Sequence, residues 1–436
     1  MGEINQAKTI KQNQLLNIWI KYQVGVIEAY TGFGKTVMGL KIIEKFRVKY
    51  DTPLVIVVPS LPLKEEWLRR LNNTPNCYVY VINTFTMSQS DTIVKDCGLI
   101  IVDEVHRCLN EDSQYFSTLL SSVSYQWFLG LSATLEKEHK KFLLSFGIST
   151  VAKITLEEGI KLGLVPLYTN YNLAVPMSIK EQEEYHKQNS IYYSNFALFS
   201  TFDRKNSFSV AMACSLAGAT KTGIIQNGVK VWRTSDEWVK EVSEESGYDE
   251  KEVRRKAAMW KRAMTEREKA LIIENKFKAV KFLIEFFLKQ DKKIIVFCPN
   301  IEIADQLEEA TGAIAYHSKI RAKRRVQILE ELKQSVIKCV ITCKSLDEGY
   351  DLHDLSVGIN FGFTSKSRQS IQRTGRLLRI DENNPDKVGI MVNLYCAGFV
   401  WEGKDVTPHD KNKLVKAQEG QIVKWVELKE LVNQLK

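Results

Sequence analysis

Short apolar runs alternate with longer amphipathic stretches over the first 147 residues. The runs are rich in β-branched and aromatic residues, which favour strands, and they lie at 24–28, 54–58, 77–82, 99–102 and 127–131. The runs at 54–58 and 99–102 are apolar on both faces, which is typical of central strands in a parallel sheet covered by helices. We therefore predict an α/β domain with right-handed crossover connections.

The same pattern returns near the C-terminal end of the chain. Five further strands are predicted, at 293–298, 314–316, 338–342, 357–361 and 389–394. Helical stretches such as 303–310 and 322–332 lie between them, and this half has no phosphate loop of its own. The predicted fold class is thus α/β, with two tandem parallel-sheet domains flanked by helices.

The segment between the two α/β regions has a different pattern. Residues 178–288 are mainly helical by pattern, charged and poor in β-rich runs, which indicates a helical insertion. The predicted domain boundaries are 1–165 for the first domain, 166–288 for the start of the second domain with its insertion, 289–400 for the second domain and 401–436 for a helical tail.

Two features of the insertion each have two interpretations. Tyr192, Phe196 and Phe199 recur at helical spacing, which fits either a core-facing stripe or a surface for base stacking. A basic helix follows, and it is either a solvated face or a phosphate-contacting surface. Its basic residues are Arg254, Arg255, Lys256, Lys261, Arg262 and Arg267.

Composition narrows the class of protein. The chain has 436 residues, of which 44% are hydrophobic and 26% are charged, and this suffices for two or three packed domains. The formal net charge of +9 points weakly towards a polyanionic partner. The eight cysteines include no C-x-x-C pair, which argues against a zinc site and against a secreted disulfide framework. We see no apolar leader or membrane-length run, so we expect a soluble cytoplasmic protein without a membrane partner.

A glycine-rich loop, 29–36, follows the first predicted strand and precedes an apolar helical pattern. Glycines let backbone N–H groups turn towards phosphates, and the following helix adds the positive end of its dipole. Ala29 stands at the first glycine position of the full motif, so the loop alone is an incomplete signature. We expect Lys35 to reach the β- and γ-phosphates of ATP and Thr36 to bind Mg²⁺. The nucleotide-binding residues predicted here are Thr31, Gly32, Gly34, Lys35 and Thr36.

Two acidic residues follow the predicted strand at 99–102. A carboxylate at the end of a buried strand, beside a phosphate loop, is suited to hold Mg²⁺, and this role falls to Asp103. Glu104 follows directly in the sequence, and we expect it to polarise the attacking water as a general base. An acidic pair after a strand is also compatible with a helix N-cap, but the loop upstream favours the catalytic interpretation.

Taken together, residues 32–36 and the sequence Asp-Glu-Val-His at 103–106 resemble the DExH branch of superfamily 2 helicases, whose motors are two tandem RecA-like domains. The resemblance covers 7–170 and 290–394, and the sequence looks most like phage and bacterial recombination or repair helicases of the branch-migration type. It implies an ATP-dependent DNA helicase or translocase, with ATP and Mg²⁺ as cofactors, that remodels branched DNA in a bacterial or phage-infected cell. Replication or recombination proteins are expected partners.

The resemblance assigns further roles in the first half. Gln14 is similar to the glutamine that reads adenine, with a lysine where an arginine is often seen before it. Pro59 and Ser60 resemble motif Ia and Thr84 resembles the motif after it, and both motifs usually touch the backbone of the strand. The S-A-T motif of such enzymes couples hydrolysis to movement, and the coupling residues here would be His106, Ser132, Ala133 and Thr134.

The second half would supply the other wall of the ATP site. Residues 295–298 resemble motif IV, 342–351 resemble motif V and 369–379 match motif VI. The resemblance places Thr342 near the strand and gives nucleotide contacts to Gly349, Asp351 and Gln372. It makes Arg376 and Arg379 arginine fingers that stabilise transition-state charge, so catalysis would rest on Lys35, Glu104, Arg376 and Arg379. ATP binding would then close the two halves and hydrolysis would release them.

Several alternatives stay open at this point. The motif set is compatible with an RNA helicase, with the motor subunit of a restriction or anti-phage system, and with a nucleic-acid-binding module whose ATP site is dead. The presence of Lys35, Asp103, Glu104 and both arginines argues against the dead site. We expect a monomer whose contacts go mainly to phosphate and sugar, so that binding is salt-sensitive and largely independent of sequence.

Overall fold

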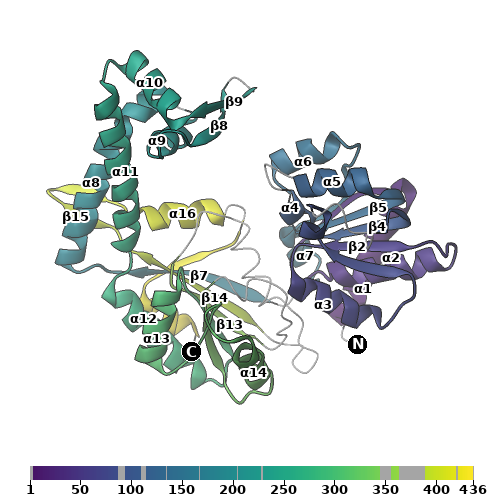
Figure 1. Ribbon diagram of the computed structural model, residues 1–436. Helices are drawn as coiled ribbons and strands as arrows, with labels where there is room; N and C mark the ends of the chain where they lie inside the picture. The colour runs from purple at the N-terminus through teal and green to yellow at the C-terminus, as the bar shows by residue number, and fades with distance from the viewer. Residues whose placement is uncertain are drawn as a thin grey trace. The chain divides into compact units, whose positions relative to one another are not determined.

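The computed structural model describes residues 3–86, 94–109, 114–133, 135–165, 167–203, 205–226, 229–343, 355–362, 388–418 and 421–435. The chain divides into two compact units. The first unit comprises Met1–Leu173, Lys281–Asn393 and Leu414–Val426, and the second comprises Ala174–Val280, Leu394–Lys413 and Glu427–Lys436. The first unit contains two separate sheets, and the second contains the insertion (Figure 1).

The N-terminal sheet has six parallel strands in the order β3-β2-β4-β5-β1-β6. Its strands are β1 Val24–Ala29, β2 Leu54–Val58, β3 Cys77–Val81, β4 Asp96–Asp103, β5 Ser124–Ser132 and β6 Thr150–Ile154. All five strands predicted for this region are confirmed. The sixth, β6, was not predicted, because it lies at the edge of the sheet and carries the exposed Lys153 in a run of only five residues.

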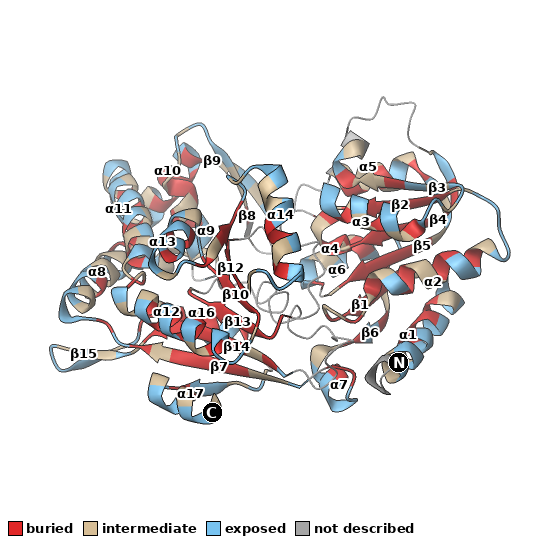
Figure 2. Ribbon diagram, turned by 90° about the horizontal axis from the view of Figure 1, so that it is seen from below, coloured by how far each residue is buried: buried red, intermediate tan, exposed pale blue. Residues whose placement is uncertain are grey.

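Helices cover both faces of this sheet. Along β4, Leu99 and Ile101 pack into one of two buried hydrophobic clusters, while Ile100 and Val102 pack into the other. Figure 2 shows the strands as buried and the outer faces of the helices as exposed. The helical elements are α1 Glu3–Tyr22, α2 Lys35–Arg47, α3 Leu61–Leu71, the 3-10 turn Ile82–Thr86, α4 Val105–Cys108, α5 Gln114–Ser122, α6 Lys137–Leu144 and α7 Leu156–Lys161.

The second sheet has seven strands in the order β11-β12-β10-β13-β14-β7-β17. They are β7 Tyr168–Val175, β10 Ile294–Phe297, β11 Ile314–Tyr316, β12 Cys339–Thr342, β13 Val357–Asn360, β14 Gly389–Cys396 and β17 Lys424–Val426. The five strands predicted here are confirmed as well. The helices α12 Glu274–Leu288, α13 Ile301–Thr311 and α14 Ala322–Lys333 belong to the same stretch of chain.

The tail corrects the expectation of a purely helical segment. It contains α16 His409–Ala417 and α17 Leu428–Leu435, but it also forms the hairpin β15 Phe399–Trp401 and β16 Lys404–Val406 and the strand β17. β17 pairs in parallel with β7 at the edge of the second sheet, with Trp425 opposite Asn172. Beside this pairing, the buried Asn172 side chain donates to Gln418 Oε1 at 2.8 Å. Each of these three strands has only three residues, and β16 and β17 include the exposed Lys404 and Lys424, so no apolar run marks these two in the sequence.

The insertion is mainly helical, as predicted, but it also holds a β-hairpin. Its elements are α8 Ile179–Phe202, α9 Ser207–Cys214, β8 Lys221–Gln226, β9 Val229–Thr234, α10 Ser235–Ser246 and α11 Glu250–Lys269. α8 and α11 pack along each other and form an arm (Figure 1). Phe199 is fully buried, and Phe196 stacks on both Tyr192 and Trp260 with ring centroids 5.5 and 5.6 Å apart. These contacts confirm the core-facing interpretation of the aromatic stripe.

The basic residues of α11 are largely engaged within the arm. Arg254 forms an ion pair with Asp236, and Arg255 pairs with Glu252 at 2.6 Å. The guanidinium of Arg267 is buried and lies 3.7 Å from the centre of the Tyr192 ring. These contacts favour a structural use of the charges over the predicted alternative of a phosphate-contacting helix.

Candidate active site

The glycine-rich loop connects β1 to α2 through left-handed backbone conformations. Gly32 has φ +87°, and Gly34, the N-cap of α2, has φ +92° and ψ +45°. Residues with a Cβ atom rarely adopt this φ at Gly34, and a Cβ there would also lie 2.6 Å from Gln12 Nε2, so the position favours glycine. The loop thus presents the N-terminus of a 13-residue helix, with its unpaired N–H groups and positive dipole end, as an anion site.

Gln12, on α1, makes the contact with this loop, whereas Gln14 does not. Gln12 is buried, its Nε2 donates to Phe33 O at 2.7 Å, and Lys41 Nζ donates to its Oε1 at 3.1 Å. Gln14 is exposed, because two residues along a helix are roughly 200° apart around its axis. Gln14 thus makes no contact with the loop, and the adenine-reading role predicted for it stays a prediction. The sequence held a signal for the Gln12 contact: Gln12 continues the buried stripe of Leu15, Leu16 and Trp19 at helical spacing.

The acidic pair at the end of β4 faces the loop lysine. Lys35 Nζ lies 3.3 Å from Glu104 Oε1, and both Lys35 and Asp103 are buried. Glu104 adopts φ +50°, and its backbone N–H donates to Asp103 Oδ1 at 2.9 Å. The two carboxylates predicted for metal binding and water activation are therefore adjacent to the predicted phosphate-binding lysine.

The two carboxyl groups have opposite pKa shifts. Burial raises the pKa of Asp103 to about 6, and the negative charge of Glu104 adds to this shift. Burial also acts to raise the pKa of Glu104, but the Lys35 ammonium and His106 hold that pKa below its ordinary value. Glu104 is thus ionised at neutral pH, as a general base must be.

Trp67 is a site residue that the sequence interpretation missed. Its Nε1–H donates to Asp103 Oδ2 at 2.9 Å. A Cβ at Gly39 on α2 would lie 2.6 Å from Trp67 Cη2, so the absence of a side chain at Gly39 lets the indole reach the helix that begins at Lys35. In the sequence, Leu63, Trp67 and Leu71 form an ordinary apolar stripe of α3, which predicts burial but not the hydrogen bond.

His106 and Ser132 are in contact, as their predicted coupling roles require. His106 Nδ1 and Ser132 Oγ lie 2.7 Å apart, and both side chains are buried. The contact follows from topology, because β4 and β5 are neighbours with Asp103 opposite Leu131. Ala133 comes next and is half-buried. Glu104 Oε2 lies 3.4 Å from the same Nδ1 atom, so the acidic pair and the end of β5 both contact the His106 ring.

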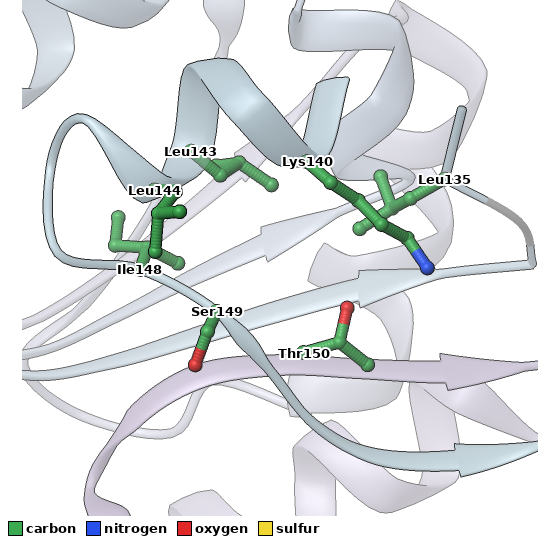
Figure 3. A pocket seen from close by; sticks show the side chains of 7 residues that line it. All are labelled: Leu135, Lys140, Leu143, Leu144, Ile148, Ser149 and Thr150. Atoms are coloured by element: carbon green, nitrogen blue, oxygen red, sulfur yellow. The ribbon is translucent and has the colours of Figure 1, made fainter. Parts of the chain in front are cut away.

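A further buried carboxylate, Glu28, lies at the end of β1. It accepts a hydrogen bond from Thr150 Oγ1 at 2.7 Å, pairs with Lys140 Nζ at 2.7 Å and accepts from the backbone N–H of Leu135 at 3.4 Å. Figure 3 shows Lys140, Thr150 and Leu135 among the residues that line a small pocket, whose other lining side chains are mainly apolar. Glu28 therefore fixes the chain just after the S-A-T motif to the strand that leads into the glycine-rich loop.

The residues predicted to touch a nucleic-acid strand divide into two groups. Pro59 and Ser60 follow β2 and Thr84 follows β3, and all three are half-buried at the carboxyl edge of neighbouring parallel strands. Thr342, in contrast, is fully buried at the end of β12, between β10 and β11. A direct contact needs an exposed hydroxyl, so this structure does not support the contact predicted for Thr342.

The remaining predicted site residues lie outside the described residues, so their roles stay predictions. They are Thr134, Gly349, Asp351, Gln372, Arg376 and Arg379. In the part of the chain that the structure describes, no helix is long and apolar enough to cross a membrane. All eight cysteines have free thiols.

Comparison with known proteins agrees with this geometry. Residues 275–381 match the family described as Helicase conserved C-terminal domain, and residues 6–95 match the family described as Type III restriction enzyme, res subunit. The chain is 23% identical over 406 residues to the DNA 3'-5' translocase XPB2 of Sulfurisphaera tokodaii, an alignment that covers 89% of this chain and 81% of the relative.

Solved structures show the same fold at low sequence identity. Dbp5 of S. cerevisiae, bound to RNA and ADP BeF3, aligns with a TM-score of 0.59 at 11% identity and covers 97% of this chain and 90% of its own. The Hef helicase domain of Pyrococcus furiosus aligns with a TM-score of 0.51 at 17% identity, and the alignment covers 89% of this chain and 94% of the Hef chain.

The chain is therefore similar in both halves to superfamily 2 helicases, and its two sheets have the fold of their two RecA-like domains. It is related to a DNA translocase, and its enzymatic activity is that of an ATP-dependent helicase. The branch-migration type suggested by the sequence is a finer assignment than these matches support.

Proposed function

We propose that this helicase acts on DNA and moves along one strand to unwind or remodel branched DNA during replication, recombination or repair. The observation that carries the choice of DNA is the similarity to a DNA translocase over 89% of the chain. The site supports a live motor, because Lys35 contacts Glu104 and His106 contacts Ser132, so the predicted catalytic and coupling residues are connected.

We further propose that ATP binds with Mg²⁺. The donor set fits, because Mg²⁺ prefers oxygen ligands and keeps several waters beside one or two carboxylates. Thr36 at the start of α2 supplies a hydroxyl, and Asp103 supplies a carboxylate. The Lys35 ammonium is paired with the Glu104 carboxylate, and a bound phosphate would take the place of that carboxylate. When bound, Mg²⁺ would neutralise phosphate charge.

Steady-state ATPase measurements with DNA or RNA as stimulant test this proposal. We expect stimulation by single-stranded or forked DNA, and loss of turnover in Lys35→Ala and in Glu104→Gln. Stimulation by RNA alone would overturn the choice of DNA. An unmutated protein without turnover would support a dead ATP site. A panel of forks, Holliday junctions, displacement loops and blunt duplexes then identifies the preferred branched substrate.

A second candidate is a motor subunit that translocates on duplex DNA without separating strands. The match of residues 6–95 to the res subunit of type III restriction enzymes favours it. Triplex displacement reports translocation on intact duplex, and strand displacement reports unwinding. Duplex-stimulated ATPase activity with triplex displacement but no strand displacement would favour this candidate over the helicase.

A further inference from the structure

The antiparallel hairpin β8–β9 has two different faces. In its register Gly223 lies opposite Trp232 and Lys221 opposite Thr234, and Lys230 is two residues before Trp232 on the same strand. Because side chains alternate along a strand, these residues share one face, and the neighbouring positions Thr222, Ile224, Val231 and Arg233 share the other. We call the face that carries Lys221, Lys230 and Trp232 the outer hairpin face.

The inner face is anchored to the arm. Ile224 is buried in the core that includes Trp238 and Trp260. The guanidinium of Arg233 lies 4.8 Å from the Trp238 ring, forms an ion pair with Glu241 and donates to Gln226 Oε1 at 3.4 Å. These contacts hold the hairpin on α10, so that the opposite face is directed away from the core.

The outer hairpin face displays an aromatic ring beside positive charge. Trp232 is 55% exposed, which is unusual because a tryptophan in a folded protein is highly buried on average. A Cβ at Gly223 would lie 2.9 Å from Trp232 Cε2, so the ring covers the glycine backbone of the opposite strand. Lys230 Nζ lies 4.4 Å from the ring centroid, and both Lys230 and Lys221 are exposed.

The surrounding sequence is free of negative charge. Between Asp203 and Asp236 the chain has no acidic residue and five basic ones. Three of the acidic residues of the following α10 are ion-paired: Asp236 with Arg254, Glu241 with Arg233 and Glu244 with Lys240. The outer hairpin face is therefore complementary to a polyanion.

We propose that the outer hairpin face binds the single strand of nucleic acid on which the enzyme acts, with Trp232 stacking on a base and Lys221 and Lys230 contacting phosphates. An exposed indole and flanking lysines are the two elements that single-strand binding requires, because bases stack on aromatic rings while cations follow the backbone. The proposal rests on the proposed nucleic-acid substrate and adds a contact surface in the insertion, separate from both sheets. A protein partner for this face is the competing outcome of the test.

The test measures the affinity of the full chain for a fluorescently labelled single-stranded oligonucleotide at several salt concentrations. Trp232→Ala should weaken binding about tenfold, and Trp232→Phe should keep most of the affinity because phenylalanine also stacks. The double variant Lys221→Gln/Lys230→Gln should lower the salt dependence, as the slope of log K against log salt, by about 1.4, the value for two phosphate contacts on a single strand.

Tyr248 provides a matched control. It is 44% exposed and has Lys256 Nζ 5.2 Å from its ring centroid, but it lies between α10 and α11 and not on the hairpin. Tyr248→Ala should bind like the unmutated protein. Thermal unfolding of each variant shows that it is folded, and the lysine variant changes only exposed side chains.

Unchanged affinity in Trp232→Ala together with an unchanged salt slope in the lysine variant would overturn the proposal. These are the results expected if the hairpin binds a protein and not nucleic acid. An equal loss in Tyr248→Ala would also overturn it, since the effect would not belong to the hairpin. In either case DNA-stimulated ATPase activity of the unmutated chain would remain, so failure of this inference is distinguishable from failure of the proposed function.

Discussion

The indole of Trp67 donates a 2.9 Å hydrogen bond to Asp103, the carboxylate proposed to hold Mg²⁺. It therefore orients a metal ligand from α3, an element outside both the glycine-rich loop and the strand that carries the acidic pair. Residues that orient metal ligands in this way tune metal affinity although they never touch the metal.

Trp67→Phe removes this donor while it keeps most of the buried ring. We expect kcat for ATP hydrolysis to fall about tenfold and the Mg²⁺ concentration for half-maximal activity to rise. Loss of a residue that is hydrogen-bonded to a metal ligand typically lowers metal affinity or activity by at least this factor. Titration of Mg²⁺ at saturating ATP measures both quantities. Trp19→Phe is the control: Trp19 is equally buried and donates to the Gly25 and Phe128 carbonyls, so it should lower stability but leave the Mg²⁺ dependence unchanged.

Gln12→Ala should raise KM for ATP, because the glycine-rich loop loses the side chain that holds Phe33. The variant loses the bond to Phe33 O and the contact with Lys41, and we expect about 1 kcal/mol of lost stability as well. Gln14→Ala should behave like the unmutated enzyme, because Gln14 is exposed. A large effect of Gln14→Ala on KM, with none from Gln12→Ala, would support the role that the sequence predicted for Gln14.

Ser132→Ala should uncouple ATP hydrolysis from movement. The variant removes the partner that lies 2.7 Å from His106 Nδ1, while Lys35, Asp103 and Glu104 stay in place. We expect ATPase activity within a few-fold of the unmutated enzyme, from roughly 1 kcal/mol of lost hydrogen bonding, and a clear rise in ATP consumed per base pair displaced. Parallel loss of both activities would argue that the contact serves catalysis itself.

Glu268 makes the second unit sensitive to acid. Burial alone would raise its pKa, but bonds to His409 and Lys413 lower it from 4.5 to about 2. A lowered pKa in the folded state contributes stability that is present above pH 4.5 and is lost as the pH falls towards 2.

The difference in unfolding free energy between the unmutated chain and Glu268→Gln should therefore shrink as the pH falls from 4.5 towards 2. Urea unfolding at several pH values measures it. Glu274→Gln, which changes an exposed pair with Lys278 on α12, should show little pH-dependent difference. A constant difference for Glu268→Gln would contradict the assignment.

Most strands could be predicted because a buried strand appears in the sequence as a short run of apolar residues. Runs such as 54–58 and 99–102 are apolar throughout, and both became central strands with residues in the buried clusters of both faces. Three strands of the two sheets, β6, β7 and β17, were missed, because charged or amide residues such as Lys153, Asn172 and Lys424 interrupt their apolar pattern.

The chemistry of the site could be predicted only in part. Lys35, Asp103 and Glu104 follow a motif whose spacing reflects the loop and the strand end, and the structure brings them together. Gln14 was chosen by its position in a motif, whereas helical geometry turns Gln12 to the loop. Trp67 could not be found, because its hydrogen bond depends on how α3 packs against α2 and β4 and not on any local pattern.

The pairing of β17 with β7 has a consequence for synthesis. β7 ends at Val175, and its edge partner begins only at Lys424. Chains emerge from the ribosome N-terminus first, so the six-stranded sheet can form before β17, the partner of β7, has been synthesised. A nascent or truncated chain that ends before β17 exposes an unpaired strand edge, which is a template for aggregation.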